Sequence, residues 1–290
     1  MRIIHIVTPV LALSLLSGCA LNKITADRTA AMLTEASAAF NEEADLTFAR
    51  EAMPANIKMM EGLAKASPEN TTLLTMLAQS YCSYAFAFLE DSDVSGDFDR
   101  ARALYRRGYE FGLRSLPDSV RRYANGDLEQ FEKAVSTIGA SESANMFWAA
   151  YCLGNWVNAT KSDVAAVAEL PRAEILMHQV LNKDPEFYYG SVHIFYGAYY
   201  GGRPKMLGGD PKQAREHLEK AIKLTGGKFL MPKYFMARFV AVPTQDEELF
   251  DRTLREIAET PASSFSAERL ANEVAKKRAL KLASNKKDLF

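Results

Sequence analysis

Residues Leu181–Gln213 read LNKDPEFYYGSVHIFYGAYYGGRPKMLGGDPKQ, and the rest of the chain is organised around them. Asp184-Pro185 predicts the end of a helix, because proline disfavours a helical residue before it and has no amide proton to donate. Gly208-Gly209-Asp210-Pro211 predicts a turn and then a new helix, with Asp210 as N-cap and Pro211 in the first helical position. We therefore expect a separate helix between these two signals.

This middle segment is rich in aromatic side chains, which surround His193 and are followed by Arg203 and Lys205. The rings belong to Phe187, Tyr188, Tyr189, Phe195, Tyr196, Tyr199 and Tyr200. A helix with so many rings cannot turn all of them to water, so we expect it to be central and to contribute to a site.

The charge balance argues against nucleic-acid binding. The chain has 290 residues, of which 35 are Lys or Arg and 36 are Asp or Glu. A balance so close to zero, without a basic run interleaved with aromatic residues, gives no electrostatic attraction for nucleic acid. The length is sufficient for one large or two small hydrophobic cores.

The N-terminus has the pattern of an export signal. Arg2 precedes an apolar run, Ile3 to Leu16, that is too short to span a membrane, and Leu16-Ser17-Gly18-Cys19 follows. This resembles a bacterial lipoprotein signal, which implies that residues 1–18 are removed and that Cys19 is lipidated. Ala20, in the position where an aspartate resembles an inner-membrane retention signal, favours the outer membrane and a periplasmic location. An ordinary secretory signal with an incidental cysteine is the alternative.

The two remaining cysteines, Cys82 and Cys152, each follow a tyrosine in an apolar context. Such surroundings favour buried thiols, although two cysteines in an oxidising compartment could also pair. The histidines of the mature chain are scattered, and neither CxxC nor HExxH occurs, so we expect no metal site and no cofactor.

The spacing of apolar residues predicts helical hairpins. Leu74, Leu77, Ala78 and Tyr81 stand six, nine, ten and thirteen positions after Pro68, as in a tetratricopeptide unit of about 34 residues. Seventy residues later, the places of Leu77, Ala78, Tyr81 and Cys82 are taken by Phe147, Trp148, Tyr151 and Cys152.

Further hairpins precede and follow these units. An earlier one combines a helix from Asn22 to Arg50 with a second that starts at Pro54, and a basic amphipathic helix from Ser266 to Leu282 could cap the stack. Insertions fall at residues 91–99 and 158–171. We predict an all-α fold of about five degenerate tetratricopeptide-like hairpins, stacked into a compact superhelix that forms one domain, residues 19–290. Such arrays bind peptides or partner proteins on a concave surface.

The order of several motifs resembles a known family. The lipobox, the helical repeats, FWAAY at 147–151, GNW at 154–156, DPEFYYG at 184–190 with His193, and LGGD at 207–210 look like the T-component lipoproteins of tripartite ATP-independent periplasmic (TRAP) transporters, the TatT family. The resemblance covers most of the mature chain and is weakest before Pro68 and after Pro261.

This resemblance implies a membrane-anchored, non-catalytic subunit that forms a homotrimer and docks a solute-binding P-component. It also implies a channel or cleft through which a small hydrophobic ligand could pass. The two glycines in YYGGRP, residues 199–204, interrupt the end of the helix and leave the lining of the cleft open.

Candidate ligand-binding residues come from the first helices of the third and fourth hairpins, whose inner faces we expect to converge on one cavity. They are Trp148, Tyr151, Asn155, Trp156, His193, Tyr196, Tyr200 and Arg203. Each also has a structural interpretation: Trp148 and His193 as core residues, Trp156 as a packing residue and Arg203 as a solvated loop charge. Gly208-Gly209 before a helix could hold a phosphate, but Asp210 would repel it.

Enzymatic interpretations find little support, because the chain has no GxSxG, Walker or dinucleotide-binding motif. A peptidoglycan-active lipoprotein is a remaining alternative, since paired carboxylates could meet in the fold. The stronger alternative is a tetratricopeptide-type lipoprotein that scaffolds an envelope assembly complex and binds proteins without a small ligand.

Overall fold

The computed structural model describes residues 4–290, with side chains from Leu21 onward. The expected signal peptide, residues 1–18, and the Cys19 thiol lie outside the described side chains. Residues 4–290 contain no strand, and this confirms the predicted all-α fold class. Within the described residues, no helix combines the length and the apolar character needed to cross a membrane.

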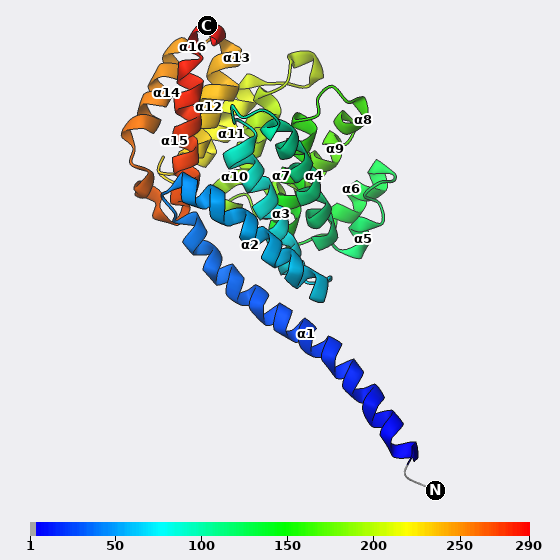
Figure 1. Cartoon of the computed structure of the whole chain (residues 1–290). Helices are drawn as coiled ribbons and strands as arrows, with labels where there is room; N and C mark the ends of the chain where they lie inside the picture. Colours follow the sequence, from blue (N-terminus) through cyan, green and yellow to red (C-terminus); the bar gives the residue numbers. More distant parts are fainter. Residues whose placement is uncertain (1–3) are drawn as a thin grey trace.

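Long helices form the body of the molecule (Figure 1). They are α1 (Ile4–Asn41), α2 (Leu46–Ala66), α3 (Thr71–Tyr84), α4 (Asp97–Ser115), α7 (Ser143–Asn158), α9 (Leu170–Lys183), α10 (Phe187–Gly201), α11 (Pro211–Leu224), α14 (Glu247–Glu259) and α15 (Arg269–Ser284). Consecutive helices pack in pairs, α3 with α4, α7 with α9 and α10 with α11, so the predicted hairpins are present. Their assignment to tetratricopeptide repeats stays a prediction.

Shorter segments connect the long helices. They are α5 (Asp118–Arg121), α6 (Leu128–Ser136), η2 (Ala140–Glu142), α8 (Val164–Val167), η3 (Lys205–Leu207), α12 (Met231–Met236), α13 (Val242–Thr244), η5 (Ala262–Glu268) and α16 (Lys286–Leu289). Two further segments are π-helical, η1 (Ala85–Leu89) after α3 and η4 (Ala237–Ala241) after α12. A π-helical turn widens a helix locally and is frequent at functional sites.

The helix boundaries show which sequence signals were strong. Asp184 caps the C-terminus of α9, and Asp210 caps the N-terminus of α11 through the amides of Lys212 and Gln213, as predicted. The first hairpin differs from the prediction, because α1 ends at Asn41 and α2 begins at Leu46, so Pro54 lies inside α2. Asp45 explains the difference, since its carboxylate accepts the amides of Thr47 and Phe48 and starts the helix earlier than Pro54 would.

The core is built around α4, which packs against both α3 and α7. The crossing is close because α4 presents glycines: a Cβ on Gly112 would lie 2.8 Å from the Cα of Ala149, and one on Gly108 would lie 2.9 Å from the Cys152 sulfur. Without side chains at these two positions, the backbones of α4 and α7 approach to a distance that no larger residue permits.

Beside this crossing, Cys82 of α3 and Cys152 of α7 form a disulfide with a Cα–Cα distance of 5.6 Å. The prediction that both are buried thiols is therefore wrong, although both cysteines are fully buried as expected. An apolar context describes the burial of each cysteine but not the distance between them. Only the packing of α3 against α7 brings them within bonding range.

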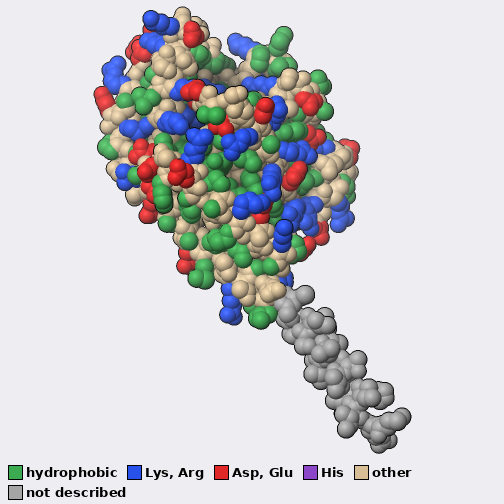
Figure 2. All heavy atoms as spheres, viewed as in Figure 1, with side chains coloured by type: hydrophobic (Ala, Val, Ile, Leu, Met, Phe, Trp, Pro, Cys, Tyr) green, Lys and Arg blue, Asp and Glu red, His purple; other side chains and the backbone are tan. Residues whose placement is uncertain are grey.

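The N-terminal side of the body is closed by α1 and α2. The described part of α1 is held to the loop after α2 by Asp27, whose carboxylate accepts hydrogen bonds of 2.6 Å from Ser67 and from Asn70. The hydrogen-bonded ion pair with Lys23, followed by these two bonds, keeps the pKa of Asp27 well below the usual range. Figure 2 shows hydrophobic side chains interspersed with Lys and Arg on the face that it views. Met32 of α1 and Phe48 of α2 are both exposed.

Candidate functional site

A cavity of about 750 Å³ lies within the helical body. Its wall combines α1, α2, α3, η1, α7, α8, α9, α10, η3, α12, η4, η5 and α15. The volume falls within the ~300–1,000 Å³ range of small-molecule sites. Residues from the start, the middle and the end of the chain therefore meet around one partly open space.

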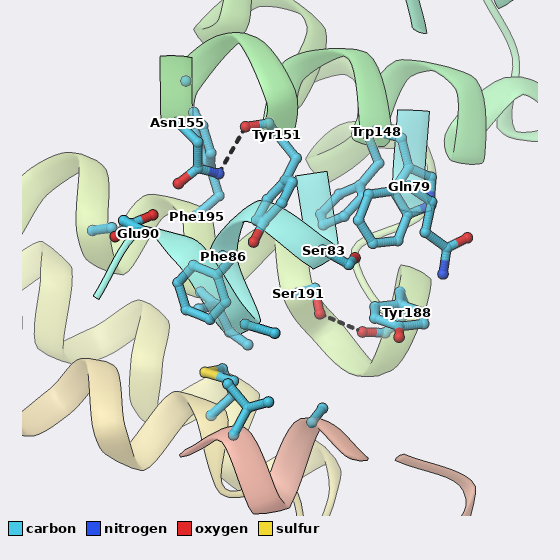
Figure 3. Close-up of a pocket in the computed structure, with 18 of the residues that line it drawn as sticks. Gln79, Ser83, Phe86, Glu90, Trp148, Tyr151, Asn155, Tyr188, Ser191 and Phe195 are labelled. Carbon is cyan, nitrogen blue, oxygen red and sulfur yellow. Dashed lines mark hydrogen bonds between the residues drawn. The ribbon is translucent and has the colours of Figure 1, made fainter. Parts of the chain in front are cut away.

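Most of the wall is apolar. Rings and thioethers dominate it, including Phe40, Met53, Met60, Phe86, Phe147, Trp148, Phe195, Met231 and Phe235. In the close-up of Figure 3, Trp148 and Tyr151 of α7, Phe86 of η1 and Phe195 of α10 point toward the same space. Such a lining accommodates a hydrophobic molecule, because it offers apolar contact over most of the surface and few polar groups to desolvate.

The start of α10 places Tyr188 in the wall through an unusual backbone. Tyr188, Tyr189 and Gly190 have φ values of 45°, 60° and 75°, so three consecutive residues are left-handed before the regular helix begins. Left-handed geometry costs about 1–2 kcal/mol for a residue with a Cβ, and glycine alone adopts it easily. Glycine is also required at 190 by space, because a Cβ there would lie 2.5 Å from a methyl carbon of Leu224.

Tyr188 is held by hydrogen bonds at one end of the cavity. Its hydroxyl donates to Glu268 Oε2 over 2.8 Å, and its carbonyl accepts from the Ser191 hydroxyl over 2.6 Å, as Figure 3 shows for Ser191. Asn41 of α1 donates to the other oxygen of Glu268 over 3.3 Å. Glu268 is 3% exposed, and this burial raises its pKa to about 7. The hydrogen bond from Tyr188 opposes the shift, because it favours the ionised carboxylate.

A second polar cluster lies at another part of the wall. Glu90, in the loop after η1, accepts a hydrogen bond from the buried Tyr105 hydroxyl and lies 3.6 Å from Arg278 Nη1 of α15. Figure 3 places Glu90 and Tyr188 on opposite sides of the cavity. The two clusters give the cavity polar groups at separate places and an apolar body between them.

Four of the eight predicted ligand-binding residues line this cavity: Trp148, Tyr151, Asn155 and Arg203. Tyr151 is half-buried, and burial followed by the charge of Glu90 raises the pKa of its hydroxyl. Asn155 donates to the Tyr151 carbonyl over 2.8 Å, which leaves its amide oxygen available (Figure 3). Arg203 stacks on Tyr199 at 3.5 Å and donates to the Tyr199 carbonyl, so it fixes the loop that follows α10.

The other four predicted residues lie elsewhere, so the expected convergence of all the rings on one cavity is wrong. Trp156 packs beneath Arg106, whose guanidinium lies 4.7 Å from a ring of the indole. His193, Tyr196 and Tyr200 face α11, where Tyr196 and Tyr200 stack on His217. They occupy one side of α10, while Ser191, Phe195 and Tyr199 occupy the side that lines the cavity.

His193, one of the predicted ligand-binding residues, belongs to a packed pair of histidines. His193 Nδ1 lies 2.8 Å from His217 Nδ1, and one of the two nitrogens must donate while the other accepts. Burial, followed by the nearby His217, lowers the pKa of His193 to about 4. Burial and Lys220 lower that of His217 to about 4 as well. Both rings are neutral near pH 7, and the pair joins α10 to α11.

Several wall residues were missed by sequence reasoning, notably Phe86, Glu90, Tyr188, Arg238, Glu268 and Arg278. Glu90 directly precedes the predicted insertion at residues 91–99, and Arg278 is one of many basic residues in the C-terminal helix. The only available signal was the placement of Arg278 among apolar positions of that helix, beside Val274 and Ala275. A charge at such a position is surrounded by protein and needs a partner.

The sequence model of one protein family, TRAP transporter T-component, matches residues 42–290. The chain belongs to this family. The resemblance seen in the sequence is thereby confirmed, and the matched region includes every cavity-lining helix except α1, which ends at Asn41. A search of curated proteins found no match. This TRAP transporter T-component is accordingly an accessory subunit of a transport system.

Proposed function

We propose that this T-component is a lipid-anchored subunit that faces the periplasm from the outer membrane, binds the solute-binding P-component and holds a small hydrophobic ligand. The association with a transport system follows from the family to which the chain belongs. The observation that carries the ligand is the cavity of about 750 Å³ with its aromatic and aliphatic wall. A protein that only docks partners has no need of an interior of this kind, since protein partners use outer surfaces.

The disulfide supports export. Disulfides persist in oxidising compartments and are rare in reducing ones, and Cys82–Cys152 joins two central helices. Anchoring rests on the sequence Leu16-Ser17-Gly18-Cys19. Cys19→Ser should release the protein from the membrane fraction and abolish the added lipid mass, while unchanged fractionation would exclude the anchor.

The test of partner choice separates the transporter subunit from the envelope scaffold. Cross-linking of the full chain in intact cells, followed by mass spectrometry, should recover a solute-binding P-component as a leading partner. Recovery of envelope assembly proteins alone would favour the scaffold. The same cross-links, separated by size, should reach the mass of three copies if the family's trimer applies here, and a ladder that stops at one copy would exclude it.

The ligand is tested by occluding the cavity. Ala198 lies on the cavity side of α10, so Ala198→Trp should fill part of the space and reduce labelling by an apolar photoreactive probe, such as a diazirine-bearing hexadecanol. The control is Lys220→Trp, at an exposed position of α11. Ala221→Trp on that helix is unsuitable, because Ala221 is fully buried. Equal labelling of both variants and the original chain would exclude the cavity as the site.

A further inference from the structure

Arg278 has hydrogen-bonding capacity that the protein does not use. It is 3% exposed, and its guanidinium carbon lies 3.7 Å above the ring of Phe86. One nitrogen, Nη2, donates to the Phe86 carbonyl, but Nε and Nη1 have no hydrogen-bond acceptor among the described residues. Nη1 lies 3.6 Å from Glu90 Oε1, which is an ion pair too long for a hydrogen bond. A buried guanidinium with two unused donors is an incomplete anion site.

A second arginine, Arg238 of η4, lies in the same part of the wall. Its Nη1 donates to the Tyr234 hydroxyl over 2.7 Å, and its other nitrogens donate to no acceptor among the described residues. Arg238 and Arg278 both line the large cavity and an adjoining pocket of about 400 Å³. The two arginines therefore stand where the apolar cavity meets a smaller and more polar space.

The charges at this place do not cancel. Among the residues that line the cavity and the adjoining pocket at this place, Arg238, Arg278 and Lys281 face the carboxylates of Glu90 and Asp91, which leaves one net positive charge. The other carboxylate of the wall, Glu268, lies at the start of α15, ten residues before Arg278, and a helix rises about 1.5 Å per residue, or about 15 Å over that length. Glu268 is thus too distant to neutralise the arginines directly, and a single anionic group would balance their charge.

The rest of the cavity is suited to an alkyl chain. Away from the arginines, the wall is largely apolar and includes Phe235, Phe195, Phe147, Trp148 and, from α1, Phe40. Arginine forms paired hydrogen bonds to carboxylates, and such bonds are stronger in surroundings that exclude water. We propose that Arg278 and Arg238 bind the carboxylate of a long-chain amphiphile whose alkyl part occupies the aromatic body of the cavity.

This inference rests on the proposed ligand-binding function and names the class of ligand. The test uses the full chain in its native membranes and two photoreactive probes of equal length, diazirine-bearing hexadecanoate and diazirine-bearing hexadecanol. Labelled peptides are identified by mass spectrometry, and the half-saturating probe concentration is measured for each. We expect both probes to label cavity peptides, with hexadecanoate saturating at a concentration at least tenfold lower.

Variants assign that preference to the arginines. Arg278→Gln and Arg238→Gln should each raise the half-saturating concentration of hexadecanoate at least fivefold and leave that of hexadecanol within twofold. Glu90→Gln should act in the opposite direction and tighten hexadecanoate binding, because it removes the neutralising charge. Arg252→Gln, on the exposed face of α14, is the matched control and should change neither value.

The outcomes are distinct. If neither probe labels cavity peptides, the proposed ligand-binding function fails together with this inference. If hexadecanol and hexadecanoate reach half-saturation at the same concentration, only the carboxylate assignment is overturned. The same holds if the preference for hexadecanoate survives in both arginine variants. Competition by unlabelled hexadecyl phosphate tenfold stronger than by hexadecanoate would also overturn it in favour of a phosphate group. Limited proteolysis verifies folding, and Arg238→Gln and Glu90→Gln keep the test decisive if Arg278→Gln does not fold.

Discussion

The Tyr188 hydroxyl donates a hydrogen bond to Glu268 across 80 positions of sequence, over 2.8 Å. It ties the left-handed turn at the start of α10 to the segment that leads into α15. Because α10 and α15 both contribute to the cavity, this bond joins two of its walls at one end. The carboxyl that accepts it is buried and has its pKa raised to about 7, so the contact is sensitive to pH.

Glu268→Gln should stabilise the protein at alkaline pH. The folded-state pKa of Glu268 is raised from 4.5 to about 7, so the stability associated with its neutral form is fully present below pH 4.5 and is lost as pH rises through 7. The shift in pKa corresponds to a loss of about 3 kcal/mol in the free energy of unfolding at pH 8. Glutamine at this position stays neutral and still accepts the hydrogen bond from the Tyr188 hydroxyl. Urea unfolding at pH 5 and pH 8 measures it, and Glu259→Gln on the surface of α14 is the control. An unchanged pH dependence would contradict the prediction.

The histidine pair should make the fold sensitive to acid. The folded-state pKa of each ring, His193 and His217, is lowered from 6.5 to about 4, so their contribution is present above pH 6.5 and is lost as pH falls through 4. We expect a loss of about 2 kcal/mol over this range, after allowance for the exposed part of His217. The double variant His193→Gln/His217→Gln should remove most of this slope in thermal unfolding, whereas His178→Gln, at an exposed position, should preserve it.

Loss of the disulfide should destabilise the core. Cys82 and Cys152 close a loop of 70 residues, for which chain entropy predicts about 4 kcal/mol. Cys82→Ala/Cys152→Ala, made in a chain with Cys19→Ser, should therefore lower the urea midpoint clearly, and a reducing agent should have the same effect on the chain with both cysteines. Detection of two reactive thiols in the unfolded, unreduced protein would show that the bond does not form.

The close crossing of α4 over α7 should tolerate no added methyl group. Gly112→Ala places a Cβ 2.8 Å from the Cα of Ala149, which requires backbone displacement, and we expect a cost of about 1–3 kcal/mol. Gly62→Ala is the matched control, because no atom lies within 4 Å of its added Cβ on α2. The same substitution there should stabilise the helix by about 0.5–1 kcal/mol. Equal effects at both positions would contradict the described crossing.

The predicted parts of the fold are those decided by short-range chemistry. Asp184 and Asp210 were located correctly because a capping carboxylate or a proline acts on amides only a few residues away. The side of α10 that lines the cavity was not predictable in the same way. Tyr196 and Phe195 are both aromatic, and the sequence pattern does not reveal which neighbouring helix each of them contacts. The answer depends on the packing of α11 against α10.

The disulfide and the left-handed turn illustrate two further causes. The repeat spacing had already placed Cys82 and Cys152 at corresponding positions of two hairpins, and it could have indicated their pairing if the packing of α3 on α7 had been assumed. The turn at Tyr188 and Tyr189 opposes local preference, because tyrosine seldom adopts positive φ. The turn is stabilised by the Ser191 hydroxyl, three residues away, and by Glu268, whose contact with Tyr188 spans 80 positions and is not revealed by the local sequence.

The position of α1 bears on how members of the family can differ. Leu33, Ser37 and Phe40 of α1 form part of the cavity wall, yet the family match begins at residue 42, directly after this helix. Part of the cavity wall therefore comes from a segment outside the region that the family model matches. Under the proposed ligand-binding function, exchange of this segment between two T-components should change ligand preference while the rest of the helical body stays the same.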